Sequence, residues 1–354
     1  MWVGILSASN KIIFANQLRG IAAILVVLSH ICGAFWSVRD VVGYYSGTPP
    51  VTGEQPFIAG YISNQYLNFG AFGVAVFFMI SGFVIPMSLG RVSKARFLIG
   101  RLLRIYPTYI AAFSVGMLAV WLSCMYWGKA FMWNYQALLS NMFLVHTFTD
   151  LGSIDLVNWT LAVELKFYIV VCLMGGLVVA GRVWPLLAFS LIIFCLNEFT
   201  KSYIGIELMF VSFMMMGVLF NYLFRGLINV FVCSAACLWI MSLFLIGWES
   251  GGVSQNYVYG FTLFAVAYAL REKFVNIRIL DFFADISYPL YVVHSLVAYG
   301  VMRVLLEHGL PTVVVVPFAA VCVVSIAYSL HVLVEKPTMH LGKKIRQPGK
   351  LVTA

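Results

Sequence analysis

Arg19 and His30 lie on one face of the first long apolar segment, residues 17–36. An offset of eleven residues is about three turns of an α-helix, so the two side chains lie roughly 16 Å apart along one stripe. Ionisable groups are costly inside a membrane span and usually belong to a reaction or a transport path. Neutral His30, in the outer half of the span, could take a proton from a hydroxyl nucleophile. A histidine that is simply hydrogen-bonded between helices remains the alternative.

A carboxylate and a phenol follow in the stretch NWTLAVELKFYI, where Glu164 and Tyr168 are one helical turn apart and Trp159 precedes the expected helix on its outer side. An acid inside a membrane needs a partner. His30 on a neighbouring helix would be a suitable one, because a carboxylate orients an imidazole and stabilises its protonated form. A surface pair between Glu164 and Lys166 is the alternative, but residues two apart face different sides of a helix.

A basic cluster precedes the third apolar segment in the stretch GRVSKARFLIGRLLRIYPTYI. Arg101 and Arg104 share a face there, with Lys94 and Arg96 just before them. Clustered guanidinium groups suit phosphate oxygens, so a polyphosphate site is one interpretation. Anchoring at the cytoplasmic surface is the other. The sequence has no Gly-rich phosphate loop and no dinucleotide fingerprint, which argues against a nucleotide-driven motor.

Three weaker patches complete the candidates. Ser81 lies in a glycine-containing apolar segment, where the pair with Gly82 most simply indicates a close helix contact. Tyr291 and His294 share a face near the start of a later segment, and an acid–proline motif, VEKP, ends the last one. The seven cysteines include no CxxC pair, and we expect inert thiols and no metal site.

The composition sets the class of protein. Of the 354 residues, 62% are hydrophobic and 10% are charged, whereas soluble domains carry about 25% charge. Hydropathy predicts an all-α, polytopic membrane protein with eight strong spans and two short ones near 185–199 and 257–270. We expect no removable signal peptide at the N-terminus. The polar stretch 37–67 is expected to be an ordered external loop.

Lys and Arg set the expected orientation. With ten helices, sixteen of the Lys and Arg residues fall on the side of the termini and three fall on the other side. The positive-inside rule therefore predicts that both termini are cytoplasmic. The same rule accounts for the basic surplus, so we expect no nucleic-acid partner.

The order of these motifs resembles that of the acyltransferase 3 family of integral-membrane acyltransferases, from residue 16 to 337. One departure is Asn16-Gln17, where the family often has an aspartate before the arginine. The matching residues are Arg19, His30, Gly70, Phe83, Arg101, Arg104, Pro107, Tyr109, Trp159, Glu164, Phe167, Tyr168, Ser287, Tyr288, Tyr291, His294, Glu335 and Pro337.

The resemblance implies a single membrane domain over 1–354, with its core at 16–337 and a basic cytoplasmic tail at 338–354. It implies an O-acyltransferase of the cell inner membrane that uses acyl-CoA, most often acetyl-CoA, and no metal. The acceptor would be a hydroxyl of an extracytoplasmic carbohydrate or lipid-linked glycan, and membrane lipids surround the chain. The implied catalytic residues are His30, Glu164 and Tyr168; the implied donor-binding residues are Arg19, Arg101, Arg104, Ser81, Tyr291 and His294.

Two alternatives stay open from the sequence. A proton-coupled transporter or flippase of a lipid-linked sugar could use Arg19, His30 and Glu164 as a proton relay. Within the acyltransferase reading, the acyl group could pass directly to the acceptor or first to His30. The sequence also leaves open whether the chain forms a homo-oligomer.

Overall fold

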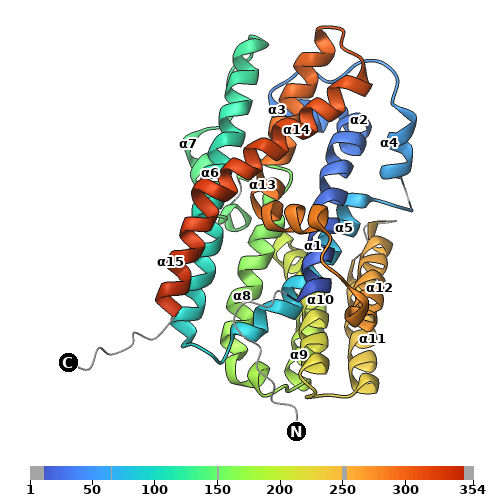
Figure 1. The fold of residues 1–354 in the computed structure, drawn as a ribbon, viewed down its shortest axis with the longest axis vertical. Coiled ribbons are helices and arrows are strands. Elements are labelled where there is room, and N and C mark those ends of the chain that lie inside the picture. Colours follow the sequence, from blue (N-terminus) through green and yellow to red (C-terminus); the bar gives the residue numbers. More distant parts are fainter. Residues whose placement is uncertain (1–11, 65, 150, 249–252, 347–354) are drawn as a thin grey trace, which may run out of the picture.

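The structure, a computed structural model, describes residues 12–64, 66–149, 151–248 and 253–346 and is built from helices (Figure 1). Helix makes up 81% of it, and the described residues form no strand. One isolated β-bridge pairs Ser63 with Asn68. The all-α class predicted from composition is therefore confirmed.

Eight helices of the described chain are long and apolar enough to cross a membrane, and they coincide with the eight strong spans predicted from hydropathy. The two short segments also form helices, α9 (Trp184–Thr200) and α12 (Gln255–Ala269). Ten crossings remain a prediction. The eight candidate spans are Ile13–Ser37, Phe69–Ser88, Lys94–Tyr126, Asn158–Val179, Tyr203–Phe224, Val230–Gly247, Arg278–Glu307 and Thr312–Gly342.

The first and last spans each include a π-helical segment. The first comprises α1 (Ile13–Leu28), η1 (Ser29–Ala34) and α2 (Phe35–Ser37), and the last comprises α14 (Thr312–Leu330), η6 (His331–Glu335) and the start of α15 (Lys336–Arg346); η1 and η6 are the π-helices. The second is α5 (Phe69–Val84) with the 3-10 turn η2 (Ile85–Ser88). The others are α6 (Lys94–Tyr126), α8 (Asn158–Val179), α10 (Tyr203–Phe224), α11 (Val230–Gly247) and α13 (Arg278–Glu307).

Polar residues in the connections start several of these helices. The side-chain oxygen of Asn68 accepts a hydrogen bond from the backbone N–H of Ala71 at 3.0 Å and so caps α5. Ser93, Ser202 and Asn229 make the equivalent contact at α6, α10 and α11. Each cap satisfies a backbone donor that the first helical turn leaves unpaired.

The connection 37–67 differs from the loop that we expected. It contains two short helices, α3 (Arg39–Ser46) and α4 (Phe57–Ile62). A third short helix, α7 (Tyr135–Met142), lies between α6 and α8. Trp159 also does not precede its helix, because α8 begins at Asn158 and places this side chain in the first turn.

The contact between α1 and α13 explains the departure at Asn16-Gln17. The side-chain amides of Asn16 and Gln17 both donate to the same carboxylate oxygen of Asp281, at 2.6 and 2.9 Å. A carboxylate at either position would repel Asp281 instead. Gly20, one turn further along α1, allows the helices to approach, since a Cβ there would lie 2.3 Å from the backbone oxygen of Leu280.

Helices α5 and α10 approach each other through two glycines. A Cβ at Gly82 would lie 2.1 Å from the carbonyl oxygen of Met214, and a Cβ at Gly217 would lie 2.4 Å from that of Met79. Close backbone contact through small residues is how helices associate in apolar surroundings. The helix contact predicted at Ser81-Gly82 is confirmed.

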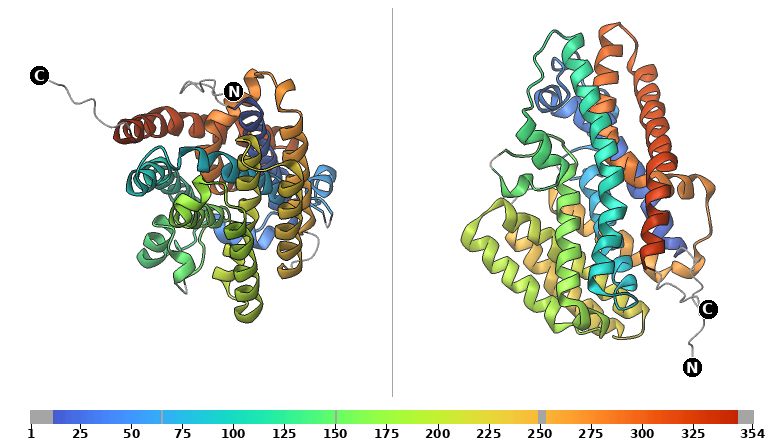
Figure 2. Two further views of the ribbon diagram at one scale, coloured as in Figure 1. Left: turned by 90° about the horizontal axis from the view of Figure 1, so that it is seen from below. Right: turned by 90° about the vertical axis from the view of Figure 1, so that its left-hand side faces the viewer.

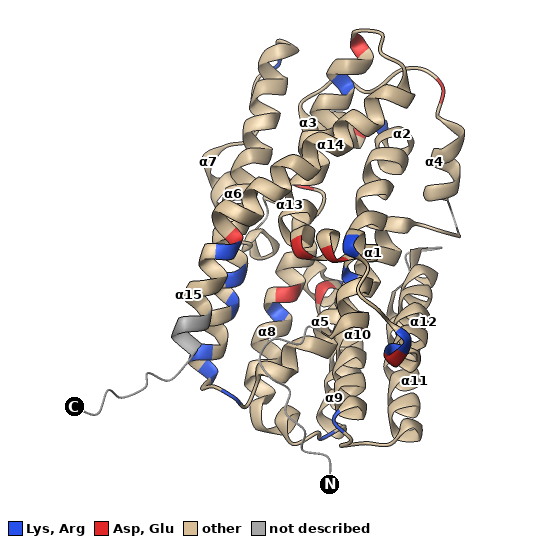
Figure 3. Cartoon of the chain, viewed as in Figure 1, with Lys and Arg blue, Asp and Glu red and all other residues tan. Residues whose placement is uncertain are grey.

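Charged residues are concentrated in one half of the bundle. Figure 3 shows Lys and Arg along the lower half of α6, against which α15 packs. The start of α1 and the end of α15 lie in that same half in Figure 1, and Figure 2 shows the same arrangement from two other sides. An even number of crossings requires this placement. The predicted tail begins as helix α15, and residues 347–354 lie outside the described chain.

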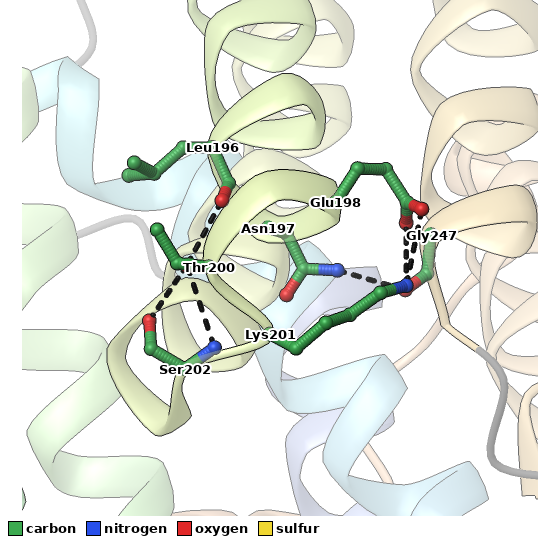
Figure 4. A network of polar contacts seen from close by, with 7 residues as sticks. All are labelled: Leu196, Asn197, Glu198, Thr200, Lys201, Ser202 and Gly247. Carbon is green, nitrogen blue, oxygen red and sulfur yellow. Dashed lines mark hydrogen bonds and ion pairs between the residues drawn. The ribbon is translucent and has the colours of Figure 1, made fainter.

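A polar network joins the turn between α9 and α10 to the end of α11 (Figure 4). Asn197 donates to the carbonyl oxygen of Gly247 at 2.9 Å. Thr200 donates to the carbonyl oxygen of Leu196, and Lys201 pairs with Glu198 at 3.0 Å. The network fixes the backbone beside Trp248 and at the start of α10.

We predict that Gly82→Ala destabilises the bundle by about 1–3 kcal/mol, because the added methyl meets backbone atoms of α10 that cannot rotate away. Thermal unfolding of the purified protein in detergent, followed by circular dichroism, measures the effect. Gly300→Ala in α13 is the matched control, since a Cβ there has no atom within 4 Å and alanine favours a helix. Equal midpoints for the two variants would contradict the prediction.

Candidate functional site

A cavity of about 80 Å³ lies between α1, α5, α6, α8 and α13, and we call it the inner cavity. Arg19 from α1, Arg104 from α6 and Glu164 from α8 line it, together with Ser81 from α5. Arg19 is within electrostatic range of both Arg104 and Glu164. The structure therefore brings together two of the three arginines singled out in the sequence, in a cavity with net positive charge.

Glu164 has partners other than the one expected. Its Oε1 accepts hydrogen bonds from the hydroxyl of Tyr168 at 2.6 Å and from that of Ser81 at 3.3 Å. No hydrogen bond or ion pair joins Glu164 to His30 in the described part of the chain, so the expected orienting hydrogen bond is wrong. The carboxylate instead belongs to the inner cavity, alongside Arg19.

Arg101 lies behind the inner cavity and does not line it. Its guanidinium donates to the hydroxyl of Ser88 at 2.5 Å. It also lies over the rings of Phe97 and Tyr168, 5.4 and 5.5 Å from their centroids. With only 6% of its surface exposed, Arg101 supports Tyr168 and thereby the carboxylate that Tyr168 holds.

His30 lies in the π-helical segment η1. Such segments interrupt the regular i→i−4 ladder and are frequent at functional sites. Its Nδ1 is 2.7 Å from the hydroxyl of Tyr299 on α13, and its ring makes an edge contact with His294, with the centroids 4.8 Å apart. His30 lines a second, outer cavity of about 460 Å³.

The tautomer of His294 follows from its partners. Its Nδ1 lies 3.1 and 2.9 Å from the carbonyl oxygens of Leu290 and Tyr291. Carbonyl oxygens only accept, so Nδ1 carries a proton, and in the neutral ring Nε2 is the unprotonated nitrogen. Nε2 is buried with no hydrogen-bond partner among the described residues. His294 thus presents a lone pair beside His30 but lines neither cavity.

The two cavities adjoin. Val74 and Tyr291 line both of them. The hydroxyl of Tyr291 is hydrogen-bonded to that of Thr160 at 2.8 Å, which fixes the ring in place. The inner cavity contains the cations and the outer cavity contains the histidine, so Tyr291 stands between the two halves of the candidate site.

Tyr299 is a partner that the sequence reasoning did not identify. A signal was present, because Tyr288, Tyr291, Ser295 and Tyr299 follow one another at helical spacing and form a polar stripe on an otherwise apolar helix. Tyr299 is completely buried. Its hydroxyl determines which way the ring of His30 can face.

The glutamate of the VEKP motif, Glu335, forms a buried hydrogen-bonded pair with a histidine. Nδ1 of His331 lies 2.6 Å from Oε2 of Glu335, and both residues lie in the π-helical segment η6. Glu335 is within electrostatic range of Arg19. This motif therefore adds a carboxylate to the charged inner half of the site.

Asp155 is a buried acid in the connection before α8. Its Oδ1 accepts hydrogen bonds from the backbone N–H of Val157 and from the hydroxyl of Ser295, which is next to His294. Burial raises the pKa of Asp155 from its ordinary 3.8 to about 7. The sequence alone does not indicate a role for Asp155, since a lone acid in a polar connection is usually exposed.

Comparison with known families gives one match. A family model described as an acyltransferase domain matches residues 12–332, which is nearly the whole chain. The matched range includes five of the six motifs and ends before Glu335 and Pro337. No curated protein and no solved structure matches the chain significantly.

The raised pKa of Asp155 predicts a pH-dependent stability. The folded state favours the protonated acid, so the stability associated with this group is complete below about pH 4 and is lost as the pH rises towards and through 7. Asp155→Asn should therefore become progressively more stable than the wild type across this window. The full difference is up to about 4 kcal/mol for a shift of this size.

Thermal midpoints of both proteins between pH 5 and pH 8 provide the measurement. Asp40→Asn is the control, because Asp40 is an exposed acid and its replacement should change the midpoint little at any pH. A constant difference between Asp155→Asn and the wild type over this range would show that the acid is not held protonated.

Proposed function

The chain belongs to this acyltransferase family, and we propose that it transfers an acyl group, most often acetyl, from cytoplasmic acyl-CoA through the bundle to a hydroxyl of an extracytoplasmic carbohydrate. The observation that carries the proposal is the pair of adjoining cavities, one with arginines and one with a histidine. Each substrate would enter from its own side of the cell membrane, and the two would meet at Tyr291.

The inner cavity suits the donor. Its arginines can hold phosphate oxygens or polarise the thioester, as guanidinium groups do with anionic and carbonyl oxygens. A cavity of about 80 Å³ is too small for the nucleotide of CoA. We therefore place the nucleotide at the basic start of α6, near Lys94 and Arg96, with the pantetheine arm directed inward past Arg104.

The outer cavity suits the acceptor and the proton transfer. The acceptor oxygen attacks the thioester carbonyl carbon, the carbon–sulfur bond breaks, and the proton of the hydroxyl passes to His30. CoA leaves as a thiolate that then takes up a proton. Arg19 lies where it can stabilise negative charge on the carbonyl oxygen during the attack.

Tyr299 acts as a positioning residue for this base. Once His30 has accepted a proton, both ring nitrogens are donors, and Nδ1 can donate to the hydroxyl of Tyr299. The 2.7 Å contact therefore stabilises the imidazolium and holds Nε2 in a defined direction. Glu164 and Tyr168 organise the donor cavity and do not orient His30.

The transporter alternative loses its main support. A proton relay through His30 and Glu164 needs the two groups to be in contact or to be linked by polar groups. In the described structure the carboxylate is occupied by Tyr168 and Ser81, whereas the histidine is bound to Tyr299. The acyl-transfer proposal needs no such relay.

We predict that His30→Ala lowers kcat by about 10²–10⁴-fold, the usual contribution of a general base, while expression and folding persist. Tyr299→Phe should lower kcat less and should shift the pH–rate profile, because only the partner of His30 is lost. Acyl transfer by purified protein in nanodiscs provides the measurement. His308→Ala, at an exposed histidine, is the control. Full activity of well-folded His30→Ala would end the base assignment.

We predict that Arg104→Ala weakens acetyl-CoA binding by about 1.5–3 kcal/mol, the usual value for a lost charge-assisted contact. Added salt should weaken wild-type binding in the same direction. Isothermal titration calorimetry measures both effects. Arg182→Ala is the matched control, because it removes an exposed arginine expected on the same side. If Arg104→Ala and the wild type bind acetyl-CoA with equal affinity, Arg104 does not bind the donor and only helps to set the orientation of the helix in the membrane.

Sealed proteoliposomes of known orientation test the proposed function as a whole. Acyl-CoA should be used only from the face of the basic cluster, and the carbohydrate acceptor only from the opposite face. Permeabilising the vesicles with detergent should remove both restrictions. This control shows that each substrate was excluded by the membrane and not by inactive protein. Use of both substrates from one face would disprove transfer across the membrane, although the chain would remain an acyltransferase.

A further inference from the structure

We propose that the outer cavity is a saccharide subsite in which the sugar rings of the acceptor stack on an aromatic wall and a sugar hydroxyl donates to Glu207. This inference rests on the proposed function and goes beyond it by naming the residues that select the acceptor. Trp159 belongs to one of the sequence motifs that we identified, whereas Glu207, Phe210 and Trp248 belong to none of them.

The size and wall of the cavity support a small-molecule ligand. Its volume of about 460 Å³ lies within the range of ligand pockets. Aromatic side chains form much of the wall and pack on one another, with ring centroids 5.1 Å apart for Trp159 and Phe210 and 4.9 Å apart for both Phe210–Trp248 and Trp248–Tyr257. Rings locked in this way offer a rigid apolar surface for the C–H face of a sugar.

Glu207 supplies the polar contact. The residue is 1% exposed and lines the cavity from α10. Its Oε2 lies 2.9 Å from Nζ of Lys166 on α8, and the hydroxyl of Thr147 lies beside the carboxylate. Its Oε1 nevertheless makes no hydrogen bond of good geometry with the described residues. A buried carboxylate oxygen without a donor is unfavourable. A hydroxyl of the ligand would supply the missing donor.

The pair with Lys166 also indicates the charge of the ligand. Lys166 balances Glu207 and is itself held by the hydroxyl of Thr147 at 3.1 Å. The subsite therefore carries no net charge from this pair. A neutral sugar with several hydroxyls fits such a site better than an anion or a cation.

Neighbouring contacts hold this wall in place. The bond from Asn197 to Gly247 fixes the backbone next to Trp248 (Figure 4). Ser202 caps the start of α10 by accepting a hydrogen bond at 3.1 Å from the backbone N–H of Gly205, two residues before Glu207. The residues that contact a ligand must be held in place by their neighbours if the site is to be specific. These two hydrogen bonds hold the backbone next to Trp248 and near Glu207.

The geometry connects this subsite to the reaction. His30 and Tyr291 line the same cavity as Trp248 and Glu207. A sugar seated on the aromatic wall can therefore place one hydroxyl at His30 and another at Glu207. The position that is acylated would follow from the spacing of these two contacts.

A long acyl chain of the donor is the competing occupant of this cavity. Its aromatic lining would accept an alkyl chain. Such a chain would leave Oε1 of Glu207 without a well-aligned donor, and the cost of that desolvation argues against it.

Glu207→Gln and Trp248→Leu test the proposal independently. Purified proteins in nanodiscs are assayed with acetyl-CoA and a panel of soluble methyl glycosides and short neutral oligosaccharides, and the acceptor best used by the wild type is taken forward. Each variant should raise the KM for that acceptor about tenfold or more, as expected for a lost hydrogen bond to a charged group or a lost stacking surface. The Kd of acetyl-CoA should change less than twofold. Glu272→Gln and Trp239→Phe, at exposed residues that line neither cavity, are the matched controls.

The outcomes separate the two proposals. If the wild type transfers acetyl groups but both variants keep the wild-type acceptor KM, the saccharide subsite is wrong and the proposed function stands. If the variants instead change the preference for acyl-chain length of the donor, the cavity holds the acyl chain. If the wild type transfers to no member of the panel yet hydrolyses acetyl-CoA, the carbohydrate acceptor fails, and the subsite fails with it.

Discussion

Compensation of charge within an apolar bundle is the constraint on which the site depends. Arg19 lies inside the first span, where an unpaired cation is costly. Glu164 and Glu335, from α8 and η6, lie within electrostatic range of it, and Arg104 adds a further positive charge. Four elements distant in sequence must therefore meet at one depth. Their meeting creates the inner cavity and determines which helices can be neighbours.

The first and the last span both depart from regular α-helix beside the charged site. The π-helical segments η1 and η6 contain His30 and Glu335, respectively. A π-helical turn shifts the residues that follow relative to a regular helix. His30 thereby reaches Tyr299 on α13, and Glu335 reaches His331 within its own segment. Elsewhere in the bundle the helices pack closely, as at Gly82 and Gly217.

Hydropathy predicted all eight long spans. This property is local, since it depends on the order of residues along one helix. The pairing of Glu164 was mispredicted because it depends on the relative height of two helices. Helix α8 begins at Asn158, and the connection that precedes it folds into the bundle, so that Asp155 is buried. The carboxylate consequently lies level with Arg19. Tyr299 was missed for a related reason, because its partner lies 269 residues away.

The wall shared by the two cavities has a consequence for the cell as well as for the reaction. A membrane that stores an ion gradient must stay impermeable to ions, even around an enzyme that has a cavity for a substrate from each side. Val74 and the hydrogen-bonded ring of Tyr291 separate those pockets. In the proposed reaction only the acyl end of the donor passes between the two cavities, and it fills the gap while it does so. Group transfer and electrical insulation can therefore coexist in one helical bundle.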